Sequence, residues 1–179
     1  MTSKILYPLI PALRSTVKYN RKEKLYCVHN SQGEEVPLNS PNKLEALFKL
    51  LRYDCAYVAD VIDILIATRP IYFNKFANKQ RLIKAGFILR DALLRDVPKS
   101  SNYLCISQSG TGEIYEVNSD RLGNYRCTCT DFEYGRNADS YSDEIAWNEE
   151  STEELVNDGG NVCKHILAVF LAVLINNKL

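Results

Sequence analysis

The chain has 179 residues, of which 46% are hydrophobic and 25% are charged, a length suited to one domain of ordinary size or two small ones. This composition excludes a disordered chain, a collagen-like repeat and a mostly membrane-embedded protein. The charges cancel overall, but residues 1–100 hold 17 Lys and Arg against 9 Asp and Glu, whereas residues 101–179 hold 5 against 13. We therefore expect any contact with a nucleic-acid backbone to belong to the basic first half.

Targeting and membrane signals are weak throughout. Pro8 and Pro11 interrupt the N-terminal apolar stretch, and no small-residue cleavage site follows, which argues against a signal peptide. The longest apolar run, Ile166–Ile175, has ten residues, whereas a bilayer crossing needs about 20. We expect an intracellular protein without membrane contact, in the cytoplasm or, in a eukaryote, in the nucleus. In that reducing compartment, clustered cysteines indicate a metal site rather than disulfides.

The pattern before Pro98 is mainly helical, after a hairpin signal. Ser40 and Pro41 are expected to cap and open the first helix, and Arg69-Pro70 to end the second. The predicted elements are strands Lys24–His29 and Glu34–Leu38 around a turn at residues 30–33, and helices Asn42–Arg52, Tyr57–Ala67 and Lys75–Arg95, the last with Phe76, Ile83, Phe87 and Leu94 on one stripe.

After Ser100-Ser101-Asn102 the period changes from helix to strand. Three strands are predicted at Tyr103–Ser107, Glu113–Asn118 and Tyr125–Cys129. Residues 133–160 are acidic and polar and are predicted to be an insertion. The final helix, from Lys164 to about Asn176, is apolar on nearly every side, so it must be buried, either inside this chain or against a partner.

Two short motifs supply three thiols and one imidazole. They are Cys127-Thr128-Cys129 and Cys163-Lys164-His165. Residues i and i+2 of a strand project to the same side, so both sulfurs of the first motif point to one place if the backbone bends there. In a helix, side chains two residues apart are separated by a rotation of about 200° around the axis. Cys163 and His165 can therefore share an ion only where the helix begins. We predict that Cys127, Cys129, Cys163 and His165 bind one structural Zn²⁺; the alternative is four unrelated buried residues.

This arrangement resembles the SWIM zinc finger, in which two strands carry Cys-x-Cys and an apolar helix opens with Cys-x-His. The resemblance runs from about Gly112 to Leu174 and implies that the four residues above are the metal ligands. Ala168, three residues after His165, fits an extension of the motif that is typical of SWIM proteins of the Shu complex, which partner RecA-type recombinase paralogues in homologous recombination. The spacer departs from the compact finger, because 33 residues, many of them acidic, separate Cys129 from Cys163. It is either a solvated loop or an acidic docking or autoinhibitory segment that competes with nucleic acid for the basic half.

The expected fold is therefore α+β, with a helical, basic N-terminal region (residues 1–100) followed by a small ββα zinc finger module (residues 101–179) that contains the acidic insertion 133–160. The resemblance implies a recognition module without catalytic residues, binding protein, DNA or both, and acting as a recombination accessory factor. A protein partner, such as a RecA-type recombinase paralogue, would dock on the outward residues of the last helix. These are Ile166, Phe170 and Val173.

The alternative function is direct nucleic-acid binding by the basic half, in a mobile-element or regulatory role. Here cations alternate with the aromatic residues Tyr72 and Phe73, which are able to stack on bases. The predicted contacts are Arg69, Lys75, Lys79, Arg81 and Lys84. An enzyme is disfavoured, because Cys27, Cys55 and Cys105 lie apart, Cys27 and His29 lack an acidic partner, and Gly110-Thr111-Gly112 lacks the lysine and helix of a phosphate-binding loop.

Overall fold

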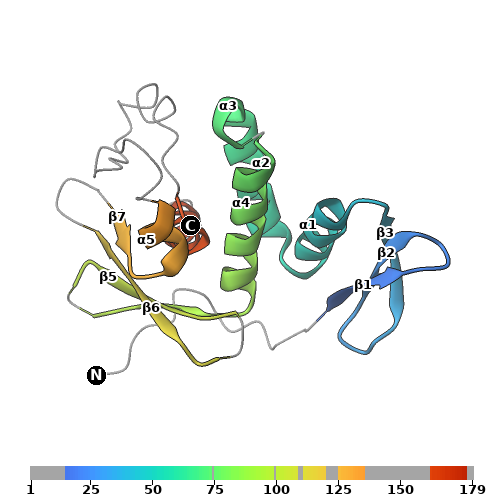
Figure 1. Cartoon of the computed structure of the whole chain (residues 1–179), viewed down its shortest axis with the longest axis horizontal. Coiled ribbons are helices and arrows are strands. Elements are labelled where there is room, and N and C mark those ends of the chain that lie inside the picture. Colours follow the sequence, from blue (N-terminus) through green and yellow to red (C-terminus); the bar gives the residue numbers. More distant parts are fainter. Residues whose placement is uncertain are drawn as a thin grey trace.

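Two antiparallel sheets and several helices make up the fold. The computed structural model describes residues 15–73, 75–98, 100–108, 111–119, 125–135 and 162–176. The first sheet has the order β1-β2-β3 and the second the order β4-β5-β6-β7 (Figure 1). The strands are β1 (Thr16–Asn20), β2 (Leu25–His29), β3 (Glu35–Ser40), β4 (Leu94–Asp96), β5 (Asn102–Ile106), β6 (Ile114–Ser119) and β7 (Tyr125–Cys127). The helices are α1 (Lys43–Asp54), α2 (Ala56–Thr68), α3 (Pro70–Phe73), α4 (Phe76–Arg90), α5 (Thr130–Gly135) and α6 (Lys164–Asn176).

The predicted N-terminal hairpin is confirmed as β2 and β3. The side-chain oxygen of Asn30 accepts hydrogen bonds from the backbone N–H groups of Gln32 (3.0 Å) and Glu34 (2.9 Å). Gly33 closes the turn with a φ of 83°, a conformation that favours glycine. A strand before this hairpin, β1, was not predicted; it pairs with β2 from Thr16 opposite His29 to Asn20 opposite Leu25.

The first helix begins later than predicted. Asn42, and not Ser40, is its N-cap: the Asn42 side chain accepts from the backbone N–H groups of Leu44 (2.8 Å) and Glu45 (3.3 Å). Ser40 instead accepts from the Asn42 N–H and donates to the Glu45 carboxylate at 2.8 Å. The second helix ends before Pro70 as predicted, at Thr68.

The third predicted helix is too long. Helix α4 ends at Arg90, because Ala92 adopts a left-handed conformation with a φ of 53°. The Ala92 N–H donates to the Leu89 carbonyl (3.1 Å), and the Leu93 N–H donates to the Ile88 carbonyl (3.0 Å). This pair of hydrogen bonds defines a Schellman cap. Leu94, predicted on the helix stripe, lies in β4 opposite Cys105. The prediction failed because Ala at this position carries no stop signal.

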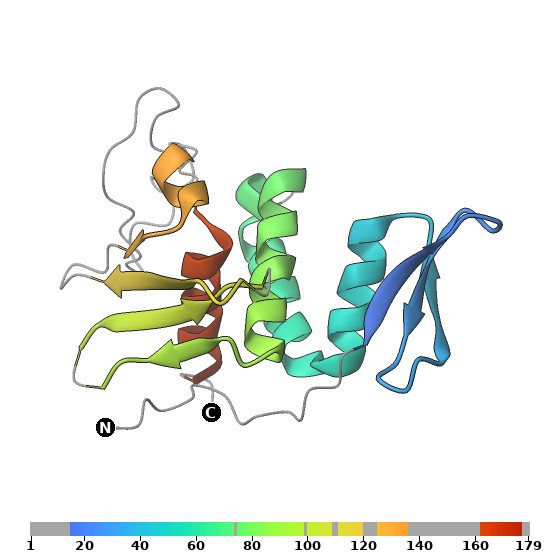
Figure 2. The same cartoon turned by 60° about the horizontal axis from the view of Figure 1, so that its bottom comes forward.

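Helix α6, predicted at its observed bounds, lies between the second sheet and α4 (Figure 2). Beyond α4 follow α2 and α1, and α1 covers the first sheet. Gly86 lets α4 approach α1 and α2, since an added Cβ would lie 2.5 Å from Leu51 Cδ2 and 3.0 Å from Ile62 Cδ1. The buried apolar residues form one continuous cluster from Val28 in β2 to Ile175 in α6. The apolar surface of α6 is thus buried inside this chain.

A buried ion pair joins α1 to the end of α4. Arg90 Nη1 lies 3.0 Å from Asp54 Oδ2, and their side chains are 11% and 2% exposed. Ser15 Oγ donates to the other Asp54 oxygen at 2.8 Å. The residue before β1 is thereby tied to the helical layer.

The mixed helix and sheet class is confirmed, and the first 100 residues contain a three-stranded sheet besides the helices. Of the predicted insertion 133–160, residues 133–135 end α5 and the rest lies outside the described residues. Among the described residues, no helix is long and apolar enough to cross a membrane.

Candidate metal centre

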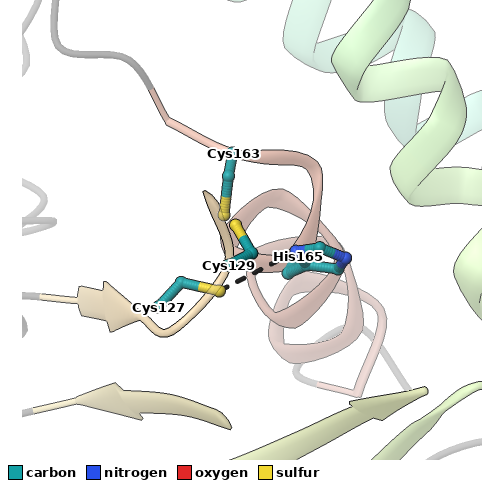
Figure 3. A group of neighbouring side chains, drawn as sticks. All are labelled: Cys127, Cys129, Cys163 and His165. Atoms are coloured by element: carbon teal, nitrogen blue, oxygen red, sulfur yellow. Dashed lines mark hydrogen bonds between the residues drawn. The ribbon is translucent and has the colours of Figure 1, made fainter. Parts of the chain in front are cut away.

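The four predicted ligands come together from two places in the chain. Cys127 ends β7, and Cys129 lies two residues further on, directly before α5. Cys163 precedes α6, and His165 is the second residue of that helix. Figure 3 shows the three sulfurs and the ring of His165 facing one another, with Nδ1 toward the sulfurs and Nε2 on the far side.

The spacing of the donor atoms fits a tetrahedral ion of the size of zinc. All four donor atoms lie within 4.8 Å of one another, and Cys127 Sγ is 3.8 Å from His165 Nδ1. Zinc bond lengths place neighbouring ligand atoms about 3.5–3.8 Å apart. The four side chains are buried. Three soft sulfurs and one imidazole suit Zn²⁺, so the site fits one structural zinc ion and leaves no ligand position for water or substrate.

The protonation of the thiols shows why a cation suits this cluster. Hydrogen bonds from the thiols of Cys127 and Cys163 lower the pKa of Cys129, and hydrogen bonds with Cys129 and Cys163 raise the pKa of Cys127. Without a nearby positive charge, the neighbouring thiols and burial oppose ionisation of Cys127 and keep its pKa raised. A dication would let all three ionise, which is the form in which cysteine binds zinc.

Hydrogen bonds between Thr128 and β6 hold the bend between the first two cysteines. Thr128 Oγ1 accepts from the Glu116 N–H at 2.9 Å, and the Thr128 N–H donates to the Glu116 carbonyl at 3.1 Å. The Phe132 N–H donates to the Cys129 carbonyl at 3.0 Å, which begins α5. Thr128 thus plays a positioning role that the sequence analysis did not assign.

A second unpredicted contact lies on the histidine. The ring of Tyr115 in β6 lies 4.6 Å from that of His165, centroid to centroid, and Tyr115 Oη donates to Glu113 Oε2 at 2.8 Å. His165 Nε2 is buried and has no hydrogen-bond partner among the described residues. The only sequence signal for this contact is that Tyr115 shares a strand face with Val117, which lies opposite Cys127.

The remaining cysteines are not members of the four-residue cluster. Burial raises the pKa of Cys55 to about 11 and that of Cys105 to about 12, so both stay protonated near neutral pH. Cys27 is also buried, in β2.

The residues predicted to contact nucleic acid differ in their exposure. Phe73 is fully buried, and Arg69 lies over the ring of Phe170, 5.9 Å from its centroid. Arg81 Nη1 donates a hydrogen bond to Asn78 Oδ1 at 3.4 Å. Lys75 and Lys84 are exposed, and Lys79 is half-buried.

The predicted partner-facing residues of α6 are mostly turned inward. Ile166 is fully buried in the core, so its assignment to a partner surface is wrong: α6 packs against α4 and the second sheet on that side. Phe170 and Val173 are half-buried and pack against the core.

Comparison with known families agrees with this geometry. Residues 114–174 match the family model of the SWIM zinc finger, a range that contains β6, β7, all but the last two residues of α6 and the four ligands. No curated protein and no solved structure matches the chain significantly. The C-terminal part is therefore similar to a SWIM zinc finger, with a zinc site whose ligands are those predicted.

Proposed function

We propose that the chain is a non-enzymatic recognition module that binds a protein partner, DNA or both, with the zinc ion holding its core together. One observation carries this proposal: four buried side chains supply a full tetrahedral ligand set at the start of α6, the helix that packs on α4. Such a centre shapes a surface rather than reacting with a substrate.

The chemistry of the other candidate groups supports a non-catalytic role. The thiols of Cys55 and Cys105 are buried and protonated at neutral pH, so neither is an activated nucleophile. Cys27 is buried as well, and its pKa is raised by burial and by Glu35.

The resemblance to SWIM proteins of the Shu complex supports a recombination accessory role with a RecA-type recombinase paralogue as partner. In that case the partner would contact what α6 leaves accessible, Phe170 and Val173, rather than Ile166. The support for this finer proposal is the motif alone, including Ala168, which is itself buried.

The alternative, direct nucleic-acid binding in a mobile-element or regulatory role, is favoured by charge. The excess of Lys and Arg lies in residues 1–100, and the described part of that region includes exposed cations. A basic surface attracts a phosphate backbone and loses affinity as salt rises.

The first test is the metal content of the purified protein. We expect one zinc ion per chain, with zinc lost and the fold destabilised in Cys163→Ser, because a structural site contributes on the order of 10 kcal/mol to the folding of a small module. Cys105→Ser is the matched control, since Cys105 is equally buried but is not a ligand; it should keep its zinc. A wild-type protein without zinc would remove the basis of the proposal.

The second step is the native mass of the chain isolated from its own host. A stoichiometric protein partner that is retained in high salt supports the recombination reading, and co-purified nucleic acid released by salt supports the alternative. A monomer that binds neither contradicts both.

A further inference from the structure

The β1–β2 hairpin stands at the end of the molecule opposite the zinc finger (Figures 1 and 2). Its residues 18–26 carry four cations and one carboxylate, Glu23. The cations are Lys18 on β1 and Arg21, Lys22 and Lys24 in the turn, and all four are exposed. The hairpin is therefore a strongly basic projection.

These cations lack the carboxylate partners that other basic residues have. Lys49 pairs with Glu45, Arg52 with Asp60 and Asp63, and Arg90 with Asp54 and Asp91. Within the described ranges, no such ion pair involves Lys18, Arg21, Lys22 or Lys24. Their charge is available to an external anion.

The same hairpin exposes an aromatic ring. Tyr19 lies opposite Tyr26 in the β1–β2 register, with ring centroids 4.9 Å apart and the rings tilted by 48°. Tyr26 packs against the core, whereas Tyr19 is 51% exposed. Tyr26 thus supports Tyr19, and the rest of the Tyr19 side chain is exposed.

The turn that presents these groups is ordered by its own hydrogen bonds. Asn20 Oδ1 accepts from the backbone N–H groups of Lys22 (3.0 Å) and Glu23 (3.4 Å). Lys24 then takes a left-handed conformation with a φ of 55° and leads into β2. Because the turn is already ordered, binding requires little further ordering of the backbone, and this lowers the entropy cost of association.

We propose that the β1–β2 hairpin is a binding site for single-stranded nucleic acid, in which Tyr19 stacks on a base and Arg21, Lys22 and Lys24 contact phosphates. This inference rests on the nucleic-acid arm of the proposed function and moves the contact away from the residues predicted on α3 and α4. An exposed aromatic beside unpaired cations is the combination that such sites use. By contrast, Lys75 before α4 and Lys84 within it are exposed, but Phe73 of α3 is buried.

A single strand is favoured over a duplex because Tyr19 is an exposed aromatic residue. Stacking needs an unpaired base, and it contributes about 1–3 kcal/mol per base. A duplex would use the cations alone.

The test is fluorescence anisotropy of a labelled 15-nucleotide oligo-dT with the full-length, zinc-loaded chain at several salt concentrations. Tyr19→Leu should weaken binding by about 5- to 150-fold. The double variant Arg21→Gln, Lys22→Gln should lower the slope of log affinity against log salt by about 1.4. Two controls should leave binding unchanged: Tyr53→Leu, since Tyr53 is exposed to a similar extent (54%) on α1, and the double variant Lys75→Gln, Lys84→Gln.

Each contrary outcome overturns the inference in a distinct way. If the hairpin variants bind as the wild type does, or if only the α4 variant weakens binding, the hairpin assignment is wrong and DNA recognition stands. If a duplex of equal length binds more tightly and Tyr19→Leu has no effect, the single-strand assignment is wrong. If the wild type binds no oligonucleotide, the nucleic-acid arm of the proposed function fails with it. Circular dichroism confirms that each variant is folded.

Discussion

At the scale of single residues, the zinc centre includes a contact between the rings of Tyr115 and His165. A histidine that binds metal is usually oriented by a hydrogen bond from its second nitrogen. Nε2 of His165 has no such partner among the described residues, and the ring lies instead against Tyr115. We infer that the ring of Tyr115 is a positioning group for His165.

Removing that ring should loosen the metal. Tyr115→Ala is expected to weaken zinc binding by about 10- to 100-fold, the usual effect of losing a group that orients a ligand, whereas Tyr115→Phe should bind zinc as the wild type does. Competition with a chromophoric chelator measures both affinities. Equal losses in the two variants would assign the effect to the Tyr115 hydroxyl and its bond to Glu113.

At the scale of elements, the end of α4 shows how a sequence pattern misleads. Ala92 occupies the left-handed position that normally holds glycine, so the apolar periodicity appeared to run on to Leu94. Left-handed backbone costs a residue with a side chain about 1–2 kcal/mol. The native protein bears that cost at Ala92, so a residue that adopts this backbone conformation without strain should raise the free energy of unfolding.

Ala92→Gly should therefore stabilise the protein by about 1 kcal/mol, although glycine usually destabilises helices. The control is Lys84→Gly, in the exposed middle of the same helix, which should destabilise by about 0.5–1 kcal/mol. Urea denaturation of both variants gives the two free energies. A loss of stability in both would show that the cap is not what ends α4.

The ligands and most elements were predictable, because their signals are local. Cysteine spacing specifies the zinc site, and α6 is bounded by Cys163 and by the end of its apolar run. Strand β1 was missed, since Thr16–Asn20 alternates only weakly and its turn contains Lys24 where glycine or asparagine would be typical. The inward direction of Ile166 and the contact of Tyr115 with His165 depend on tertiary packing, which no local pattern carries.

At the scale of the whole molecule, α6 makes the zinc finger and the helical layer share one core. It contacts α4 and α2 on one side and β6 and β7 on the other, and the buried cluster is continuous. Although residues 1–100 and 101–179 differ in charge and pattern, the described residues of both contribute to one continuous apolar cluster.

Unfolding in urea should accordingly be a single transition. Far-ultraviolet circular dichroism reports mainly the helices, and a chromophoric chelator reports zinc release; we expect coincident midpoints, since one cooperative unit loses both. Zinc release at lower urea, with the helical signal retained, would instead show that the finger opens on its own. Cys105→Ser, which keeps the ligand set, should give coincident curves as well.

Helix α6, which lies between the second sheet and α4, is made after the other described elements. During synthesis, which proceeds at roughly 5–20 residues per second, Cys127 and Cys129 emerge seconds before Cys163 and His165. Until then α4 has its apolar face open, and the first two thiols have no further ligands. Ion capture and burial of α6 must therefore wait until residues 163–176 have been made, so a shortage of zinc would affect the nascent chain while the face of α4 that α6 covers is still open.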